Sequence, residues 1–500
     1  MITHQELATH ANAADCWVAI HGGVYNLTTF LREHPGGSKI ILKEAGTDAT
    51  EAYAAYHPKD LIGTILPPGC RVGSLDPASK PVPRPDAAQA QKGATATGAS
   101  EKPALSQILN SYDFEAIAKQ TMKPEAWAYY SSGAEDEITL RENHLAFHRI
   151  ALKPRVLVNV SKINTSTTLL GSRTRMPIYI TACALGKLGH PEGEAVLTRA
   201  AGTRGVIQMM PTLASCSMDE MLDARIPGQD AWYQLYVNAD RNVTRGVIEK
   251  AERRGCKALV VTVDAPQLGR REKDMRLKYE DDVSDIMVKQ GDSGVNRKQG
   301  AARAISSFID PSLCWQDIEW MTSITSLPIV LKGIQTGADA VKSAQLVGPT
   351  GRGVSGIVVS NHGGRQLDTC RSGIEILPEV VRDLERAGLK GKLEIYVDGG
   401  FRRGSDVVKA IALGAKGIGI GRPSLYAMST YGQAGVEKLL DILEEEMIMV
   451  MGLLGVTDLS QITPDLVDAT HLVSRMTLVP DMLQRLTYEP LATAAFKSKL

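Results

Sequence analysis

The feature that most constrains the fold is an alternation of short β-rich runs with amphipathic helical stretches beyond residue 105. There are eight such runs: Pro177–Thr181, Val206–Met210, Trp232–Val237, Ala258–Val263, Pro328–Leu331, Gly356–Ser360, Leu393–Val397 and Gly417–Ile420. Strands separated by helices indicate parallel β-α-β units, and eight of them predict a (β/α)8 TIM barrel. A doubly wound open sheet is the alternative. We favour the barrel because polar and glycine-rich residues follow almost every run, where barrel enzymes build their sites.

A segment of different composition divides the chain. Residues 77–103 are rich in Pro, Ala, Gly, Ser and Thr and hold no aromatic residue, so they cannot form a core. We therefore expect a small domain over residues 1–76, a flexible linker over 77–104, and the barrel with a C-terminal tail over 105–500.

Charge and composition exclude several classes of protein. The 56 basic residues balance the 56 acidic ones, so we expect no nucleic-acid partner, because such binding needs a basic excess. The longest apolar run, Met447–Val456, is too short to span a membrane. The first residues resemble neither a secretory signal nor a transit peptide. Seven scattered cysteines without a CxxC pair favour a reducing compartment over a disulfide framework or zinc site.

Two histidines stand out in the small domain. His34 begins the motif HPGG, and His57 follows 23 residues later at the end of a helical stretch. A six-coordinate haem needs two axial imidazoles, one on each face, and a proline–glycine turn lets backbone approach a flat macrocycle. The pair therefore predicts a haem site.

Residues 1–76 resemble a cytochrome b5 domain. The resemblance rests on Trp17, Val24–Thr28, Phe30, the HPGG motif and His57. It implies a small α+β domain in which His34 and His57 bind the iron of haem b.

The ends of the predicted barrel strands carry the residues suited to catalysis. Glycines and arginines follow the last two strands, in DGGFRRG and GIGIGRP, where barrels commonly bind phosphate, so we expect a phosphorylated cofactor. His362 and Arg365 share one glycine-flanked turn, which suits a base beside a clamp for a small anionic substrate. Lys332 is placed to face a cofactor that becomes anionic on reduction, and Asp264 to pair with His362.

These motifs, SNHGGRQLD above all, resemble the FMN-dependent 2-hydroxy-acid oxidising family over about residues 105–490. The resemblance implies that His362 is the base, supported by Asp264, and that Lys332 stabilises the reduced flavin. It implies substrate contacts from Tyr129, Tyr236, Arg271, Arg365, Ala184 and Leu213. It implies FMN contacts from Gln234, Thr262, Lys332, Ser360, Asp398, Gly400, Arg402, Gly421 and Arg422.

The fusion of a cytochrome b5 domain to this barrel narrows the resemblance to the flavocytochrome b2 branch of the family. That implies a homotetramer that oxidises L-lactate, or a related L-2-hydroxy acid, to the 2-keto acid. Electrons would pass one at a time from FMN through haem b to an acceptor such as cytochrome c. Direct use of O₂, with H₂O₂ as product, is the alternative. A third hypothesis, an inactive barrel with an electron-carrier domain, conflicts with the intact set of His362, Arg365, Lys332 and Asp264.

The sequence departs from the family pattern at three places. Cys183 stands where the family usually has Thr, and Pro211 where a Ser commonly contacts the flavin. Residues 348–353 form an insertion before the sixth strand, at the end of the barrel away from the site. Ala184 and Leu213 are apolar, which suits the methyl group of lactate.

The chain ends in Ser498-Lys499-Leu500. A terminal S-K-L is a peroxisomal address, so we expect the protein in peroxisomes, with the cytoplasm or the mitochondrial intermembrane space as the alternative.

Overall fold

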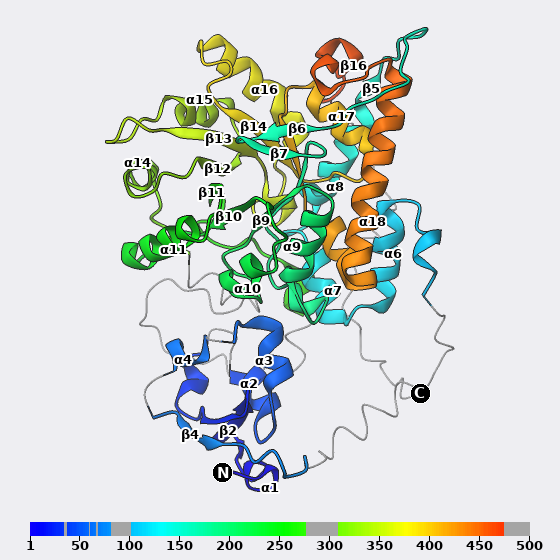
Figure 1. Ribbon diagram of the computed structural model, residues 1–500. Helices are drawn as coiled ribbons and strands as arrows, with labels where there is room; N and C mark the ends of the chain where they lie inside the picture. Colours follow the sequence, from blue (N-terminus) through cyan, green and yellow to red (C-terminus); the bar gives the residue numbers. More distant parts are fainter. Residues whose placement is uncertain (35–37, 60, 67–68, 82–101, 277–308, 475–500) are drawn as a thin grey trace, which may run out of the picture.

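The computed structural model describes residues 1–34, 38–59, 61–66, 69–81, 102–276 and 309–474. Within these residues the chain forms a small domain and a large barrel, which are the two bodies visible in Figure 1. Most of the predicted linker, two glycines of the HPGG motif and the terminal tripeptide lie outside the described residues.

The small domain is an antiparallel sheet covered by short helices. Its strands pair in the order β1 (Ala11–Asn12), β2 (Asp15–Ile20), β3 (Gly23–Asn26) and β4 (Arg71–Ser74). The helices are α1 (His4–Leu7), α2 (Ser38–Glu44), α3 (Thr50–Tyr56) and α4 (Ile62–Ile65). Alternation along β2 turns Cys16, Val18 and Ile20 towards α2, where they pack around Ile41. This α+β arrangement confirms the predicted fold of the domain.

The large domain is a closed barrel of eight parallel strands. They are β8 (Ile178–Ile180), β9 (Ile207–Met210), β10 (Ala231–Leu235), β11 (Ala258–Thr262), β12 (Ile329–Ile334), β13 (Val354–Val359), β14 (Glu394–Asp398) and β15 (Gly417–Ile420). Each coincides with one of the eight predicted runs, so the predicted barrel is confirmed and the open sheet is excluded.

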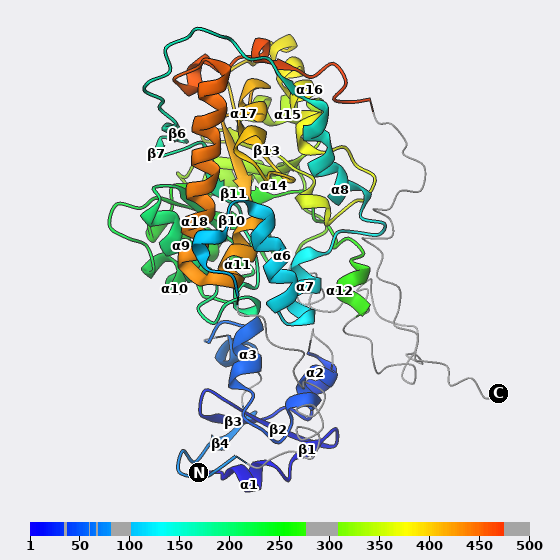
Figure 2. The ribbon, with the colours of Figure 1, turned by 90° about the vertical axis from the view of Figure 1, so that its right-hand side faces the viewer.

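Amphipathic helices surround the barrel (Figures 1 and 2). The crossover helices are α9 (Glu194–Thr203), α10 (Met218–Asp223), α11 (Arg241–Arg253), α14 (Trp315–Ile324), α15 (Gly337–Gln345), α16 (Gly373–Arg386), α17 (Gly404–Ala412) and α18 (Arg422–Leu454). In α16, Leu377, Val380 and Leu384 recur every three or four residues and are all buried against the sheet. Helices α6 (Ser111–Thr121), α7 (Pro124–Ser131), α8 (Ile138–Leu145) and α12 (Glu272–Arg276) precede or interrupt this pattern. No described helix is long and apolar enough to cross a membrane.

An aromatic layer fills the barrel interior. Tyr179, Trp232 and Tyr396 are fully buried, with ring centroids 5.2–5.8 Å apart. The layer separates the two ends of the barrel, because interior side chains of such barrels stack in filled layers.

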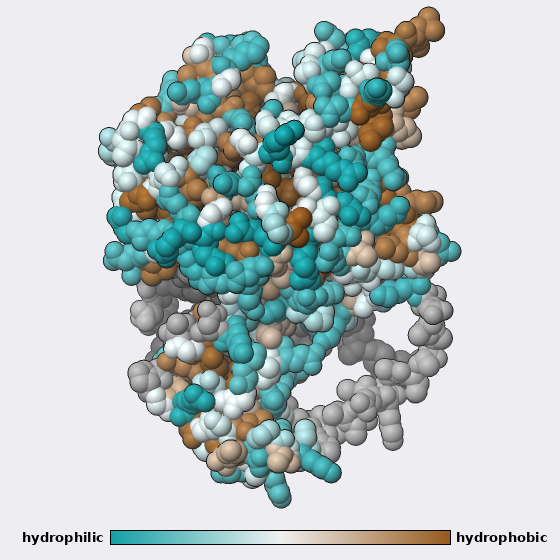
Figure 3. Space-filling view, in the orientation of Figure 1, coloured by the Kyte–Doolittle hydropathy of each residue, from teal (hydrophilic) through white to brown (hydrophobic). Residues whose placement is uncertain are grey.

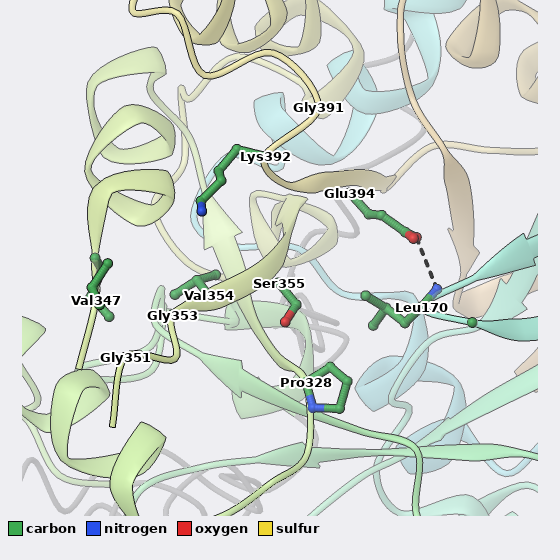
Figure 4. Close-up of a pocket in the computed structure, with 12 residues that line it drawn as sticks. Leu170, Pro328, Val347, Gly351, Gly353, Val354, Ser355, Gly391, Lys392 and Glu394 are labelled. Atoms are coloured by element: carbon green, nitrogen blue, oxygen red, sulfur yellow. Dashed lines mark hydrogen bonds between the residues drawn. The ribbon is translucent and has the colours of Figure 1, made fainter. Parts of the chain in front are cut away.

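The N-terminal end of the barrel holds a cavity of about 460 Å³, shown in Figure 4. It lies between the turn of the hairpin β6 (Thr167–Leu169) and β7 (Ser172–Thr174) and the loop that contains residues 348–353. Glu394 accepts a hydrogen bond from the Leu170 amide at 3.0 Å and so fixes the hairpin to β14. The insertion therefore lies at the end opposite the strand C-termini.

The small domain contacts the barrel through α3. The Ser215 hydroxyl donates a hydrogen bond to the Ala55 carbonyl at 3.0 Å, and Tyr56 packs against the apolar core of the barrel. Figure 2 shows α3 as the part of the small domain nearest the barrel. The end of the helix that carries His57 therefore approaches the loops after β8 and β9.

Candidate functional site

A cavity opens at the C-terminal ends of the barrel strands. Fifteen of the seventeen barrel residues proposed as site residues line it: Tyr129, Ala184, Leu213, Gln234, Tyr236, Thr262, Arg271, Lys332, His362, Arg365, Asp398, Gly400, Arg402, Gly421 and Arg422. The other two, Asp264 and Ser360, lie behind the lining and bind it by hydrogen bonds. The strand ends thus bring the predicted residues together.

His362 follows β13 in a turn that few residues adopt. Its φ of +59° is left-handed, and its amide donates a hydrogen bond to the Ser360 hydroxyl at 3.0 Å. The Asn361 side chain accepts a hydrogen bond from the Gly364 amide at 3.1 Å and closes the turn. This conformation is costly for a residue with a side chain and is typical of active sites.

The imidazole of His362 is held between a carboxylate and a phenol. Nδ1 lies 2.8 Å from Oδ1 of Asp264, and Nε2 lies 3.3 Å from the Tyr236 hydroxyl. Burial lowers the pKa of His362 despite the adjacent Asp264, so the ring is neutral near pH 7. Burial alone would raise the pKa of Asp264, but His362 holds it below the ordinary value. The dyad is therefore a neutral base beside an ionised carboxylate.

Three guanidinium groups face the same cavity; Arg271 is buried, and Arg365 and Arg422 are half-buried. Arg365 donates to the carbonyls of Tyr129 and Ser132 at 2.7 and 3.0 Å, and its guanidinium lies over the Tyr129 ring. Arg422 donates to carbonyls of Tyr130, Gly363 and Ser132. Burial and then the charge of Arg365 lower the pKa of Arg271 to about 9 and of Arg422 to about 10. Because burial and mutual repulsion disfavour these cations, an anion that binds between them is stabilised.

Lys332 forms a second buried charge pair. Its Nζ lies 3.2 Å from Oδ2 of Asp398 and donates to the Ser360 hydroxyl at 3.0 Å. Burial alone would lower the pKa of Lys332, but Asp398 and Asp264 raise it, so the ammonium stays charged. A fixed positive charge thus lies on the cavity wall.

The cavity has the donor set that FMN requires. Gly400 has a φ of +86°, and a Cβ there would lie 1.9 Å from the Asn143 carbonyl, so only glycine fits. Arg402 and Arg422, which line the same cavity, supply guanidinium groups for a phosphate. The Gln234 side chain, which donates to Thr262 at 2.9 Å, supplies an amide that can hydrogen-bond to the edge of the flavin ring. Oδ1 of Asp398 is buried and has no partner among the described residues, so it can accept a further hydrogen bond.

The small domain places its two histidines as a haem requires. The rings of His34 and His57 have centroids 6.2 Å apart and nearly perpendicular planes, at 82°. A metal–imidazole bond is about 2 Å, so two axial rings on one iron have centroids about 6 Å apart. Burial and then His34 lower the pKa of His57 to about 4, which keeps its nitrogen free to bind metal.

Some cavity residues escaped prediction. Asn143 and His144 on α8, and Tyr130 on α7, also line the cavity. His144 lies 3.1 Å from the Gly400 carbonyl and 2.6 Å from the Tyr112 hydroxyl, so both its nitrogens are engaged. Asn143 and His144 stand in the helical segment RENHLAFHRI, and because helical residues follow no strand end, their place in the cavity could not be predicted. The two departures, Cys183 and Pro211, line the same cavity, and burial raises the pKa of the Cys183 thiol to about 12.

Comparison with known proteins identifies both domains. Residues 118–469 match the FMN-dependent dehydrogenase family, and residues 3–76 match the cytochrome b5-like haem/steroid binding domain. The chain is 48% identical to the L-lactate dehydrogenase (cytochrome) of Wickerhamomyces anomalus, over 99% of this chain and 85% of that protein. Identity to the Saccharomyces cerevisiae protein of the same name is also 48%, over 98% and 83%. Glycolate oxidase 3 of Oryza sativa subsp. indica is 42% identical over 71% and 95%.

Solved structures agree with these relatives. The flavin-binding domain of baker's yeast flavocytochrome b2 superposes with a TM-score of 0.69 at 50% identity, over 79% of this chain and 95% of that chain. Mandelate oxidase with (S)-2-phenylpropionate superposes with a TM-score of 0.61 at 34% identity, over 71% and 96%.

Proposed function

The chain belongs to the FMN-dependent dehydrogenase family and carries a cytochrome b5-like domain, and on this premise we propose that it oxidises L-lactate, or a closely related L-2-hydroxy acid, to the 2-keto acid. When bound, FMN would supply a two-electron acceptor for the substrate and haem b a one-electron carrier. The observation that carries the proposal is the Asp264–His362 dyad beside Arg365 in one cavity.

Arg365 and Tyr129 bind the substrate carboxylate. Arg365 is fixed by two carbonyl bonds and by its stacking on Tyr129, so its remaining donors are oriented before the substrate arrives. Arg271, held by the Arg365 carbonyl and by Gln366, adds positive potential on the same side. Ala184 and Leu213 give an apolar wall for the methyl group of lactate.

His362 accepts the proton that leaves the substrate, from C2 or from the hydroxyl group. It is neutral near pH 7, and Asp264 stabilises the imidazolium that forms. Tyr236, whose hydroxyl lies 3.3 Å from Nε2 of His362, is placed to bind the substrate hydroxyl while the proton moves. The dyad and the tyrosine thus hold the reacting C–OH group against the base.

The remaining residues hold the cofactor. Lys332 supplies positive charge where the reduced flavin carries negative charge, and Arg402, Arg422 and the glycines Gly400 and Gly421 bind the phosphate end. Gln234, Thr262, Ser360 and Asp398 complete the polar contacts. His34 and His57 bind haem iron, and α3 brings the His57 end of the small domain towards the barrel.

Transfer through haem is favoured over direct reaction with O₂. The L-lactate dehydrogenases (cytochrome) match 98–99% of this chain, whereas glycolate oxidases match 71–72%. An acceptor such as cytochrome c then receives the electrons from haem. Direct oxidation by O₂ is the second candidate, because those glycolate oxidases share the barrel.

Stopped-flow reduction of the full-length holoenzyme by L-lactate tests the proposal. Flavin and haem bands are followed separately, with and without O₂ and with and without cytochrome c. We expect flavin bleaching first, haem reduction second, and turnover that depends on cytochrome c. Absence of flavin reduction would refute lactate oxidation, and oxygen consumption that outpaces haem reduction would establish the oxidase instead. His362→Gln, which keeps the phosphate site, should bind FMN but reduce it very slowly.

We also propose that copies of the chain assemble as a homotetramer through their barrels. The segment between β5 (Ala151–Leu152) and β6 projects from the molecule, and Figure 3 shows apolar atoms at its tip. Val156 is 81% exposed and Leu157 fully exposed, and Leu453 near the end of α18 is also exposed. Large apolar side chains that are this exposed favour a protein contact. Light scattering should give a tetramer for the wild type and smaller species for Leu157→Asp.

We propose a peroxisomal location, because the chain ends in Ser498-Lys499-Leu500, a receptor-read address. The test compares N-terminally tagged full-length chain with a chain that lacks residues 498–500. Punctate peroxisomal signal that the deletion abolishes supports the proposal, and mitochondrial or diffuse signal that the deletion leaves unchanged refutes it.

A further inference from the structure

Tyr179 lies in the barrel interior in the same row as Asp398. In the sheet, Gly419 of β15 pairs with Tyr179 of β8 on one side and with Asp398 of β14 on the other. A Cβ on Gly419 would lie 2.9 Å from the Tyr179 hydroxyl oxygen and 3.0 Å from Cβ of Asp398. The missing side chain of Gly419 therefore leaves a gap that is bordered by both the phenol and the Asp398 side chain.

Both groups have an unused hydrogen-bonding atom. Tyr179 is fully buried, and its hydroxyl has no partner among the described residues. Oδ1 of Asp398 has none either, whereas Oδ2 pairs with Lys332 at 3.2 Å. Buried polar atoms are rarely left unpaired in folded proteins. Burial and the charge of Asp398 raise the pKa of Tyr179 well above its ordinary value. The phenol therefore keeps its proton and can donate a hydrogen bond to an acceptor.

We propose that Tyr179 is a positioning residue whose hydroxyl donates a hydrogen bond to Asp398 and thereby sets how strongly Asp398 holds the Lys332 ammonium. This inference rests on the proposed function, since it takes Lys332 as the positive charge beside the flavin. Tyr179 itself does not line the cavity, so it acts only through Asp398.

The sign of the effect follows from the charges. The phenol proton offsets part of the carboxylate charge, so more of the Lys332 field reaches the cavity. Without the hydroxyl, the carboxylate attracts Lys332 more strongly and the potential in the cavity becomes more negative. The cavity then stabilises a negatively charged flavin less, whether that charge comes from reduction or from an added anion.

The test compares Tyr179→Phe with Tyr396→Phe in the FMN-loaded full-length enzyme. Tyr396 is the matched control, because its ring belongs to the same aromatic layer but its hydroxyl donates to Glu394 near the opposite end of the barrel. The probe is sulfite, which binds oxidised flavin as an anion and bleaches it. We expect the sulfite Kd to rise at least about threefold in Tyr179→Phe, as for loss of a hydrogen bond to a charged group, and to stay unchanged in Tyr396→Phe.

A double-mutant comparison locates the effect. In an Asp398→Asn background, where the carboxylate charge is absent, Tyr179→Phe should leave the sulfite Kd unchanged. Equal sulfite affinity in wild type and Tyr179→Phe, measured on the FMN-bound fraction, would refute the inference, as would an equal change in Tyr396→Phe. If the wild type binds sulfite normally but L-lactate does not reduce it, the proposed function fails while this inference still stands.

Discussion

Replacement of Asp264 by Asn tests the base most directly. The amide has the size of the carboxylate and can still accept from Nδ1 of His362, so the ring keeps its orientation. What is lost is the charge that stabilises the imidazolium, at a separation of 2.8 Å. Coulomb's law with an effective dielectric constant of about 20 gives about 6 kcal/mol for two unit charges at that separation.

That energy sets the expected size of the effect. Each 1.4 kcal/mol or so of barrier corresponds to about tenfold in rate, so the full charge interaction corresponds to about 10⁴-fold. Because the imidazolium is only partly formed in the transition state, we expect flavin reduction to slow by about 10³- to 10⁴-fold. FMN content and the lactate concentration at half-saturation should change little, because Asp264 lies behind the cavity lining.

The assay is anaerobic stopped-flow reduction of the flavin band by L-lactate. Asp310→Asn is the control, because the Asp310 side chain is 5% exposed against 3% for Asp264 but pairs with Arg241 at 2.7 Å outside the cavity. It should retain the wild-type rate per bound flavin. A rate for Asp264→Asn within tenfold of wild type, with FMN fully bound, would show that the carboxylate does not support the base.

Other predictions follow from single features of the two sites. The pKa of His362 is lowered from 6.5 by burial, so the base stays neutral as pH falls through 6.5, and kcat/KM for L-lactate should reach half its plateau below pH 6.5; a half-point above 6.5 contradicts this. His57→Ala should convert the six-coordinate haem spectrum of the protein to a five-coordinate one, and an unchanged spectrum refutes the ligand assignment. Arg422→Leu should weaken FMN binding about tenfold or more, measured by flavin fluorescence after dilution, because it removes a cation from the phosphate end. Cys183→Thr should leave the flavin reduction rate within about threefold while tightening FMN binding, since it adds a hydroxyl donor to the lining; weaker binding in equilibrium dialysis would count against that role.

The barrel was predictable because its signal is local. Each of the eight strands is a short apolar run that the burial pattern of a parallel barrel requires, such as Ala258–Thr262, whose five residues are all buried. The site was predictable for a related reason. A closed parallel barrel brings all strand ends to one rim, so His362 and Asp264 meet although they are 98 residues apart.

Other features depend on tertiary packing that no local pattern encodes. Asn143 and His144 reach the cavity only because α8 packs against the turn at His362 and the glycines after β14. The pairing of Lys332 with Asp398 joins two strands that are not neighbours, since β13 lies between them. The contact between Ser215 and Ala55 depends on how two separately folded domains meet, which neither domain's sequence pattern indicates.

The aromatic layer of Tyr179, Trp232 and Tyr396 has a practical consequence for attaching this protein to a surface. It isolates the N-terminal rim, with its loop of residues 348–353 and the exposed Lys392, from the catalytic mouth and from the side where α3 meets the barrel. A cysteine introduced in that loop would anchor the molecule to an electrode with its mouth and its haem domain facing the solution. The same separation makes the loop a natural place to insert a peptide tag without disturbing electron flow.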